Sequence, residues 1–213
     1  MFPHERWEFE RMFRQQIKSL EERNLPEAIK EMLEKRHDDV IKIAERIHLF
    51  RRGSIFFLPI IPRIYLSVYS QIQLVRNNGK AGYTHIDVEN IVDLAQTPDR
   101  PYYIFDVDIG RHMRGKFPGE VSKLIERQET IRRCLTDVEA ISLCVHTNIL
   151  QRYTVDATGS MFLSSKESEV PQIVTNFSER IPLLATDYIW RHTNPPRKNR
   201  VSPSCNKCEI LIV

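Results

Sequence analysis

The sequence predicts an α+β protein in which a mixed β-sheet is covered by helices, with an N-terminal amphipathic helical hairpin packed on it. Two observations carry this prediction. Apolar residues recur at helical spacing through the first fifty positions, and from residue 54 onward short β-branched and aromatic runs alternate with turn residues. Because two amphipathic helices cannot bury their apolar stripes alone, the following sheet is the expected packing surface. We therefore expect a helical hairpin over residues 1–53 and an α+β domain over residues 54–213, joined in one compact unit.

Two apolar stripes define the expected hairpin. They consist of Phe9, Phe13, Ile17 and Leu20, and of Ile29, Leu33, Val40, Ala44 and Ile47. Between them, Asn24 can take the left-handed conformation that ends a helix, and Pro26 suits the first turn of the next helix. The pattern stops at residues 51–53, where the composition changes.

Apolar runs and turn signals place the elements that follow. Residues 55–62 and 102–107 read as buried strands because they are almost continuously apolar. Between them, the apolar period of residues 65–75 fits a helix and in part a strand, and we favour the helix. We also expect a short strand over 83–86 and a short helix over 88–94.

The second half of the chain has one sharp local signal. Thr136 and Glu139 have the spacing of a capping box, which predicts a helix from there to about Leu150. We also expect a helix from Glu120 to about Arg133 and an apolar C-terminal strand over residues 209–213. The edge of that last strand could pair two copies of the chain, so a homodimer is a possible assembly.

Composition limits the class of protein. The 213 residues are 41% hydrophobic and 28% charged, as in a globular chain. The net charge of +3, from 31 basic and 28 acidic residues, is too small to predict nucleic-acid binding by the whole molecule.

Two further features bear on where the protein resides. Pro59 and Pro62 interrupt the longest apolar stretch before it reaches the roughly 18 residues that a membrane-spanning helix needs, and residues 1–11 do not read as a secretory signal. We therefore expect no membrane insertion and a cytoplasmic location. Four cysteines in a chain of this length are expected to be reduced.

Two carboxylates form the first candidate site. Asp106 and Asp108 flank Val107 at the end of an apolar strand, so the two-residue period of a strand sends both side chains to the same side. Such a pair could hold Mg²⁺ or Mn²⁺ and support a metal-assisted hydrolase or phosphoryl-transfer enzyme. The alternatives are a solvated strand end and an ion pair with the loop at Arg111.

A second candidate metal site lies near the C-terminus. Cys205 and Cys208 form a Cys-x-x-Cys pair, which can supply half of a tetrahedral zinc site. The alternative is that both are structural or incidental cysteines.

Three classes of function remain open. The preferred one is a module that binds a small ligand or a protein at a pocket formed by Tyr83, His85, Asp106, Asp108, Arg111 and His112. The metal-assisted enzyme is the alternative. A weaker alternative is nucleic-acid binding through the basic segment from Trp190 to Arg200.

Four segments together resemble a bacterial family of uncharacterised proteins. These are LPIIPRIYLSVYSQIQLVRNNGKAGYTH (58–85), TPDRPYYIFDVDIG (97–110), CLTDVEAI (134–141) and SPSC (202–205). The resemblance covers roughly residues 55–205. Because the family carries no assigned activity, the resemblance implies no catalytic residue.

Overall fold

The computed structural model describes residues 3–48, 55–128, 131–163, 168–176, 178–188 and 198–213. Its helices are α1 (Pro3–Glu21), α2 (Glu27–Glu34), α3 (His37–His48), α4 (Val68–Leu74), α5 (Pro118–Gln128) and α6 (Asp137–His146). Short 3-10 helices are η1 (Val88–Asn90), η2 (Arg111–Met113) and η3 (Ile149–Gln151).

The first seven strands are β1 (Ile55–Ile60), β2 (Arg76–Asn77), β3 (Lys80–Ala81), β4 (Tyr83–Thr84), β5 (Ile91–Asp93), β6 (Tyr102–Val107) and β7 (Arg132–Cys134). The remaining seven are β8 (Thr154–Asp156), β9 (Ser160–Leu163), β10 (Ser168–Thr175), β11 (Pro182–Tyr188), β12 (Arg200–Val201), β13 (Ser204–Asn206) and β14 (Ile210–Ile212). These helices and mixed sheets confirm the α+β class.

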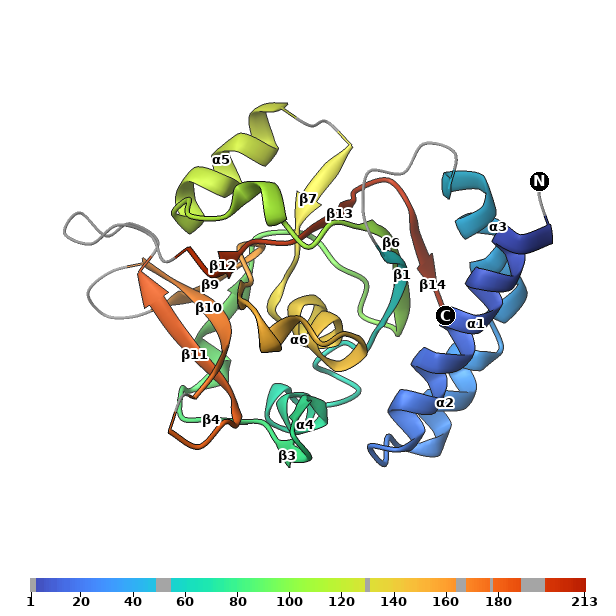
Figure 1. Cartoon of the computed structure of the whole chain (residues 1–213), viewed down its shortest axis with the longest axis horizontal. Helices are drawn as coiled ribbons and strands as arrows, with labels where there is room; N and C mark the ends of the chain where they lie inside the picture. The colour runs from blue at the N-terminus through green and yellow to red at the C-terminus, as the bar shows by residue number, and fades with distance from the viewer. Residues whose placement is uncertain (1–2, 49–54, 129–130, 164–167, 177, 189–197) are drawn as a thin grey trace.

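The strands of the described residues form several sheets, where the sequence suggested a single one. A three-stranded antiparallel sheet has the order β1-β6-β14. A seven-stranded mixed sheet follows the path β12-β8-β10-β11-β4, and β5 and β9 extend it from β10. Two-stranded pairs join β13 to β7 and β2 to β3. Figure 1 shows α1–α3 beside the three-stranded sheet, β9–β11 on the opposite side of the molecule, and α6 between them.

The three-stranded sheet forms the centre of the hydrophobic core. Every residue of β6 is buried, and so is β1 apart from its first residue, which explains why both strands read as continuous apolar runs. Pro59 is tolerated because β1 is an edge strand and lacks a second neighbour. Side chains satisfy carbonyl groups of that strand: Gln16 donates to the oxygen of Phe57 at 2.8 Å, and Ser142 donates to the oxygen of Pro59 at 2.6 Å.

The N-terminal part contains three helices where two were expected. Asn24 has a φ of 58° and follows α1, as predicted for a left-handed helix end. The residues expected to form the second helix instead give α2 and α3, with a break at residues 35–36. Phe13 of α1 stacks on Tyr103, whose hydroxyl donates to the oxygen of Leu33 at 3.2 Å. One hydrophobic core therefore includes these helices and the sheet.

Several local predictions were right and others were wrong. The strands at 55–60 and 102–107, the helix α4 and the terminal strand β14 lie where expected. The predicted helix over 88–94 is wrong, since η1 leads directly into β5, which pairs with β9. The predicted helix from Glu120 to Arg133 is α5, which ends at Gln128, and β7 follows it.

The capping-box signal locates the start of α6. The carboxylate of Glu139 accepts a hydrogen bond from the Thr136 amide at 2.9 Å, and the helix begins at Asp137. Among the described helices, none combines the length and apolar character required to cross a membrane.

Candidate functional site

Asp106 is drawn into a buried ion pair. The backbone of Asp106 has a φ of 52°, which departs from the extended conformation of a strand, so the two-residue alternation from Asp106 to Asp108 does not hold. Arg132 donates to Oδ2 of Asp106 at 2.7 Å and to its backbone oxygen at 2.9 Å. The same guanidinium donates to Oγ and the backbone oxygen of Ser204. The Arg132 guanidinium therefore joins β6, β7 and β13, and the carboxylate of Asp106 is one of its partners.

Asp108 has different partners. Its backbone forms a bridge with Ser204, and its Oδ1 accepts a hydrogen bond from the amide of Gly110 at 2.8 Å. Its other carboxylate oxygen, Oδ2, lies 3.3 Å from Nδ1 of His112. The His112 side chain is largely exposed. This arrangement is a turn stabilised by Asp108 at the end of β6.

The candidate metal sites receive no support from the described residues, among which there is no group of three or more His, Cys, Asp and Glu that could hold a metal ion. Cys205 is fully buried on β13, and Cys208 is exposed. Burial raises the pKa of the Cys205 thiol to about 12. Mg²⁺, Mn²⁺ and Zn²⁺ binding therefore remain predictions from the sequence alone.

Tyr83 and His85 lie at a sheet edge. Tyr83 belongs to β4, the last strand on the path of the seven-stranded sheet, and its ring meets that of His85 edge-on at 4.9 Å. The Tyr83 hydroxyl accepts a hydrogen bond from Nδ2 of Asn176 at 3.0 Å. The six residues of the predicted pocket are thus divided between the end of β4 and the end of β6. One of them, Arg111, lines a hollow that is described next.

Two adjoining hollows run along η3. They have volumes of about 400 and 500 Å³, and both are lined by Gln151, Arg152 and Tyr153. We call them together the arginine groove. Arg111 and Asn148 line the first hollow, and the second is lined additionally by Asn78, Thr175, Arg180 and Asn199, among others.

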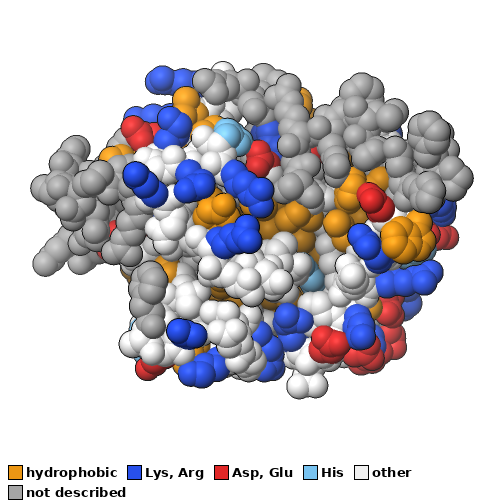
Figure 2. All heavy atoms as spheres, in the orientation of Figure 1, with side chains coloured by type: hydrophobic (Ala, Val, Ile, Leu, Met, Phe, Trp, Pro, Cys, Tyr) orange, Lys and Arg blue, Asp and Glu red, His pale blue; other side chains and the backbone are white. Residues whose placement is uncertain are grey.

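The charge of the arginine groove is one-sided. Among the described residues that line the two hollows there are three arginines, Arg111, Arg152 and Arg180, and no Asp or Glu. All three arginines are exposed, and within the described part of the chain none of them forms an ion pair. Figure 2 shows Lys and Arg side chains gathered above α6, over β12 and β13, on the face that it presents.

Backbone contacts hold the groove in shape. The Tyr153 amide donates to the backbone oxygen of Ile149 at 3.0 Å, which closes η3. The Thr175 hydroxyl donates to the backbone oxygen of Leu150 at 3.1 Å. The guanidinium of Arg114 lies 5.6 Å from the centre of the Tyr153 ring, and its Nε donates to the oxygen of Lys198. The groove is therefore assembled from the ends of several elements that are tied together.

The basic segment from Trp190 to Arg200 is only partly described, since residues 190–197 lie outside the described residues. Its last residue, Arg200, is unsuited to ligand binding because its guanidinium is buried and bonded to Asp156 and Asp187 at 2.7–3.2 Å. Lys198 is exposed, and Asn199 lines the arginine groove. At this end of the segment, Arg200 therefore belongs to a buried ion pair and Asn199 belongs to the arginine groove.

A second ionic cluster lies at the start of α6. Arg63 donates to Oδ1 of Asp137 at 2.6 Å and to Oδ1 of Asp93 at 3.0 Å, and Ser160 also donates to Asp93. Burial and the neighbouring Asp137 raise the pKa of Asp93 to about 6. Asp137 is completely buried, whereas Asp93 and Arg63 remain partly exposed. The cluster connects β5, α6 and the loop after β1.

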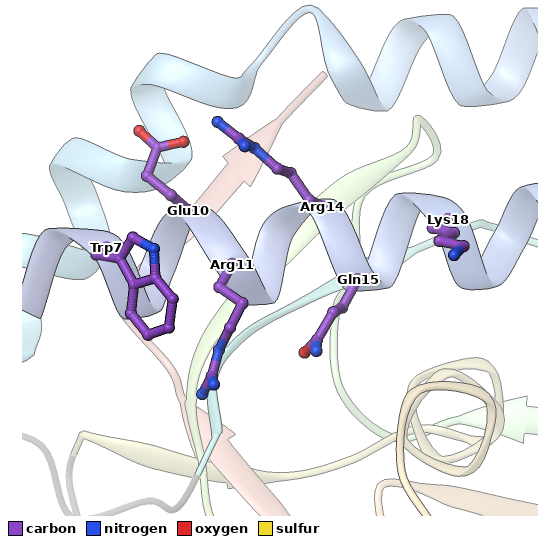
Figure 3. A pocket seen from close by; sticks show the side chains of 6 residues that line it. All are labelled: Trp7, Glu10, Arg11, Arg14, Gln15 and Lys18. Atoms are coloured by element: carbon purple, nitrogen blue, oxygen red, sulfur yellow. The ribbon is translucent and has the colours of Figure 1, made fainter.

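A third hollow, of about 310 Å³, follows the outer face of α1. Figure 3 shows its lining residues, with Trp7, Arg11 and Gln15 on one side of the helix. The Arg11 guanidinium lies 4.8 Å from the centre of the Trp7 ring. Its described lining comes from this single helix and includes Glu10, so within the described residues no second element is present to position a ligand.

Sequence reasoning missed most of the groove. Gln151, Arg152 and Tyr153 follow the end of a helix, and no motif marks them. The hollows combine residues from position 55 to position 199, which local spacing cannot connect.

No family model, curated protein or solved structure matches this chain. The resemblance to a bacterial family of uncharacterised proteins remains a prediction from the sequence.

Proposed function

We propose that this chain is a binding module for an anionic ligand that carries phosphate groups, and that the arginine groove is its site. The observation that carries the proposal is the lining of the two hollows, in which three exposed arginines are accompanied by no described carboxylate. A guanidinium offers a planar set of donors that matches phosphate oxygens. An anionic ligand would pair with these cations, which have no acidic partner among the described lining residues.

The remaining lining residues favour binding over catalysis. They are mainly amides, hydroxyls and apolar side chains, including Asn78, Asn148, Gln151 and Thr175. Such groups orient a ligand through hydrogen bonds. The described lining offers no His, Cys, Asp or Glu to act as a general base, so the enzyme alternative has less support at this site.

Titration with inorganic pyrophosphate, followed by ¹H–¹⁵N NMR, tests the proposal. We expect chemical-shift changes centred on residues 151–153. Arg152→Gln should weaken binding about tenfold, because it removes a charged hydrogen-bond donor from the middle of the groove. Lys42→Gln, which removes one exposed positive charge from α3, is the matched control and should bind like the parent.

Two results would contradict the proposal. One is an absence of shift changes at residues 151–153 under pyrophosphate saturation. The other is an equal loss of affinity in Arg152→Gln and Lys42→Gln, which would indicate a response to net charge and not a site.

A further inference from the structure

We infer that the ligand of the arginine groove is a single strand of nucleic acid, with successive phosphates on its arginines and a base on Tyr153. This inference rests on the proposed function and specifies its ligand. The two hollows adjoin through three shared residues, and each has a volume within the range of a site for one small molecule. Two such volumes in series suit successive units of a polymer better than one compact ligand.

The cations are spaced along the groove. Arg111 lines only the first hollow, Arg180 lines only the second, and Arg152 lines both. Three cations distributed over two adjoining hollows suit the repeated charge of a phosphodiester backbone. Arg114 and Lys198 lie beside the groove and add to its positive charge, since Arg114 both faces the Tyr153 ring and bonds to the Lys198 backbone.

Tyr153 provides an aromatic surface inside this charged groove. It lines both hollows, is partly exposed, and is held by its amide hydrogen bond and by the neighbouring Arg114 guanidinium. Aromatic side chains bind single strands by stacking against exposed bases, whereas bases in a duplex are already stacked on one another. An aromatic ring between arginines therefore favours a single strand over a duplex.

Amide side chains supply partners for base edges. The side chains of Asn148 and Gln151 in the first hollow, and of Asn78 and Asn199 in the second, form no hydrogen bond with another described residue. Amides both donate and accept hydrogen bonds, as the polar edges of bases do.

Fluorescence anisotropy with labelled single-stranded 12-mers of oligo-dT and oligo-U tests the inference, with a 12-bp duplex, a mononucleotide and pyrophosphate as competitors. We expect either single strand to bind at least about tenfold more tightly than the mononucleotide, because the strand engages several arginines at once. Three phosphate contacts predict a slope of about −2 in a plot of log affinity against log salt concentration.

Two variants separate charge from stacking. Arg152→Gln should weaken strand binding about tenfold and make the salt slope shallower by about 0.7. Tyr153→Leu should weaken binding roughly five-fold or more and leave the salt slope unchanged, because the lost interaction is stacking. Lys42→Gln is the control for net charge and should alter neither quantity.

The outcomes distinguish failure of the inference from failure of the proposed function. If pyrophosphate binds at residues 151–153 but the strands bind no more tightly than the mononucleotide, the ligand is a small anion and the inference is wrong, whereas the proposed function stands. Equal or tighter duplex binding, or equal effects of Arg152→Gln and Lys42→Gln on the strand, also overturns the inference. If neither pyrophosphate nor a strand binds, both are wrong.

Discussion

Arg132 and Asp106 form a buried ion pair in which the guanidinium binds both the carboxylate and the backbone oxygen of the aspartate, at 2.7 and 2.9 Å. Both residues are 5% exposed. Arg132 also bonds twice to Ser204, so one side chain links three strands. The sequence interpretation of Asp106 as a metal ligand did not include this partner.

Arg132→Met should lower the free energy of unfolding by about 3–5 kcal/mol, because it leaves a buried carboxylate without its cation. Urea denaturation at pH 7 measures the change. The double variant Arg132→Met/Asp106→Asn should recover part of the loss, since the unpaired charge is gone. A loss below about 1 kcal/mol in the single variant would contradict the structural role.

Asp93 should make stability fall as the pH rises from about 4 to about 6. The pKa of Asp93 is raised to about 6 in the folded protein, so the folded state keeps a proton that the unfolded state loses near pH 4. Over this window deprotonation favours the unfolded chain, and above pH 6 the contribution is constant. The expected effect is on the order of 1–3 kcal/mol.

Asp93→Asn tests this pH dependence because asparagine cannot titrate. Relative to the parent, the variant should gain stability between pH 4 and pH 6, as measured by urea midpoints at each pH. Asp99→Asn, at an exposed position, is the control and should keep the parent's profile. Parallel profiles for the parent and Asp93→Asn would show that the pKa of Asp93 is not raised.

Gly110 allows a close backbone approach. It has a φ of 76°, and a Cβ added there would lie 2.3 Å from the backbone oxygen of Ser202. Gly110→Ala should therefore destabilise the protein by about 2–4 kcal/mol, from left-handed strain and from the displaced backbone.

Gly115→Ala provides the matched control for that contact. Gly115 has the same φ of 76°, but a Cβ would meet nothing within 4 Å. It should cost only about 1–2 kcal/mol, so the difference in thermal or urea unfolding between the two variants isolates the Ser202 contact. Equal losses would show that the backbone near Ser202 moves to accommodate the side chain.

The four cysteines should differ sharply in reactivity. Cys208 is exposed, whereas Cys134, Cys144 and Cys205 are buried, and burial raises the pKa of each of these three thiols. Titration of the folded protein with a thiol-reactive chromogenic disulfide should give one fast thiol, and unfolding in urea should release three more. Cys208→Ser should abolish the fast phase, and Cys205→Ser should preserve it. A fast phase that survives in Cys208→Ser would place the reactive thiol elsewhere.

Local patterns predicted much of the fold because the responsible interactions lie close together in the chain. The uninterrupted apolar runs predicted β1 and β6, and the Thr136–Glu139 spacing predicted the start of α6. β7 escaped prediction because three residues carry little periodicity and the strand is stabilised by pairing with β13, about 70 positions further along the chain.

By itself, the sequence of this protein determined the α+β class, the buried strands, the capped helix and the terminal strand, since each depends on apolar periodicity or on contacts within a few residues. Only the tertiary structure decided which charged side chains form buried ion pairs and which stay exposed to solvent. Asp106 pairs with Arg132, 26 positions away, and Arg200 pairs with Asp156, 44 positions away. Arg152 and Arg180, in contrast, line the same open groove. The physical reason is that burial and pairing depend on distances in space, which sequence spacing does not specify once the chain folds back on itself.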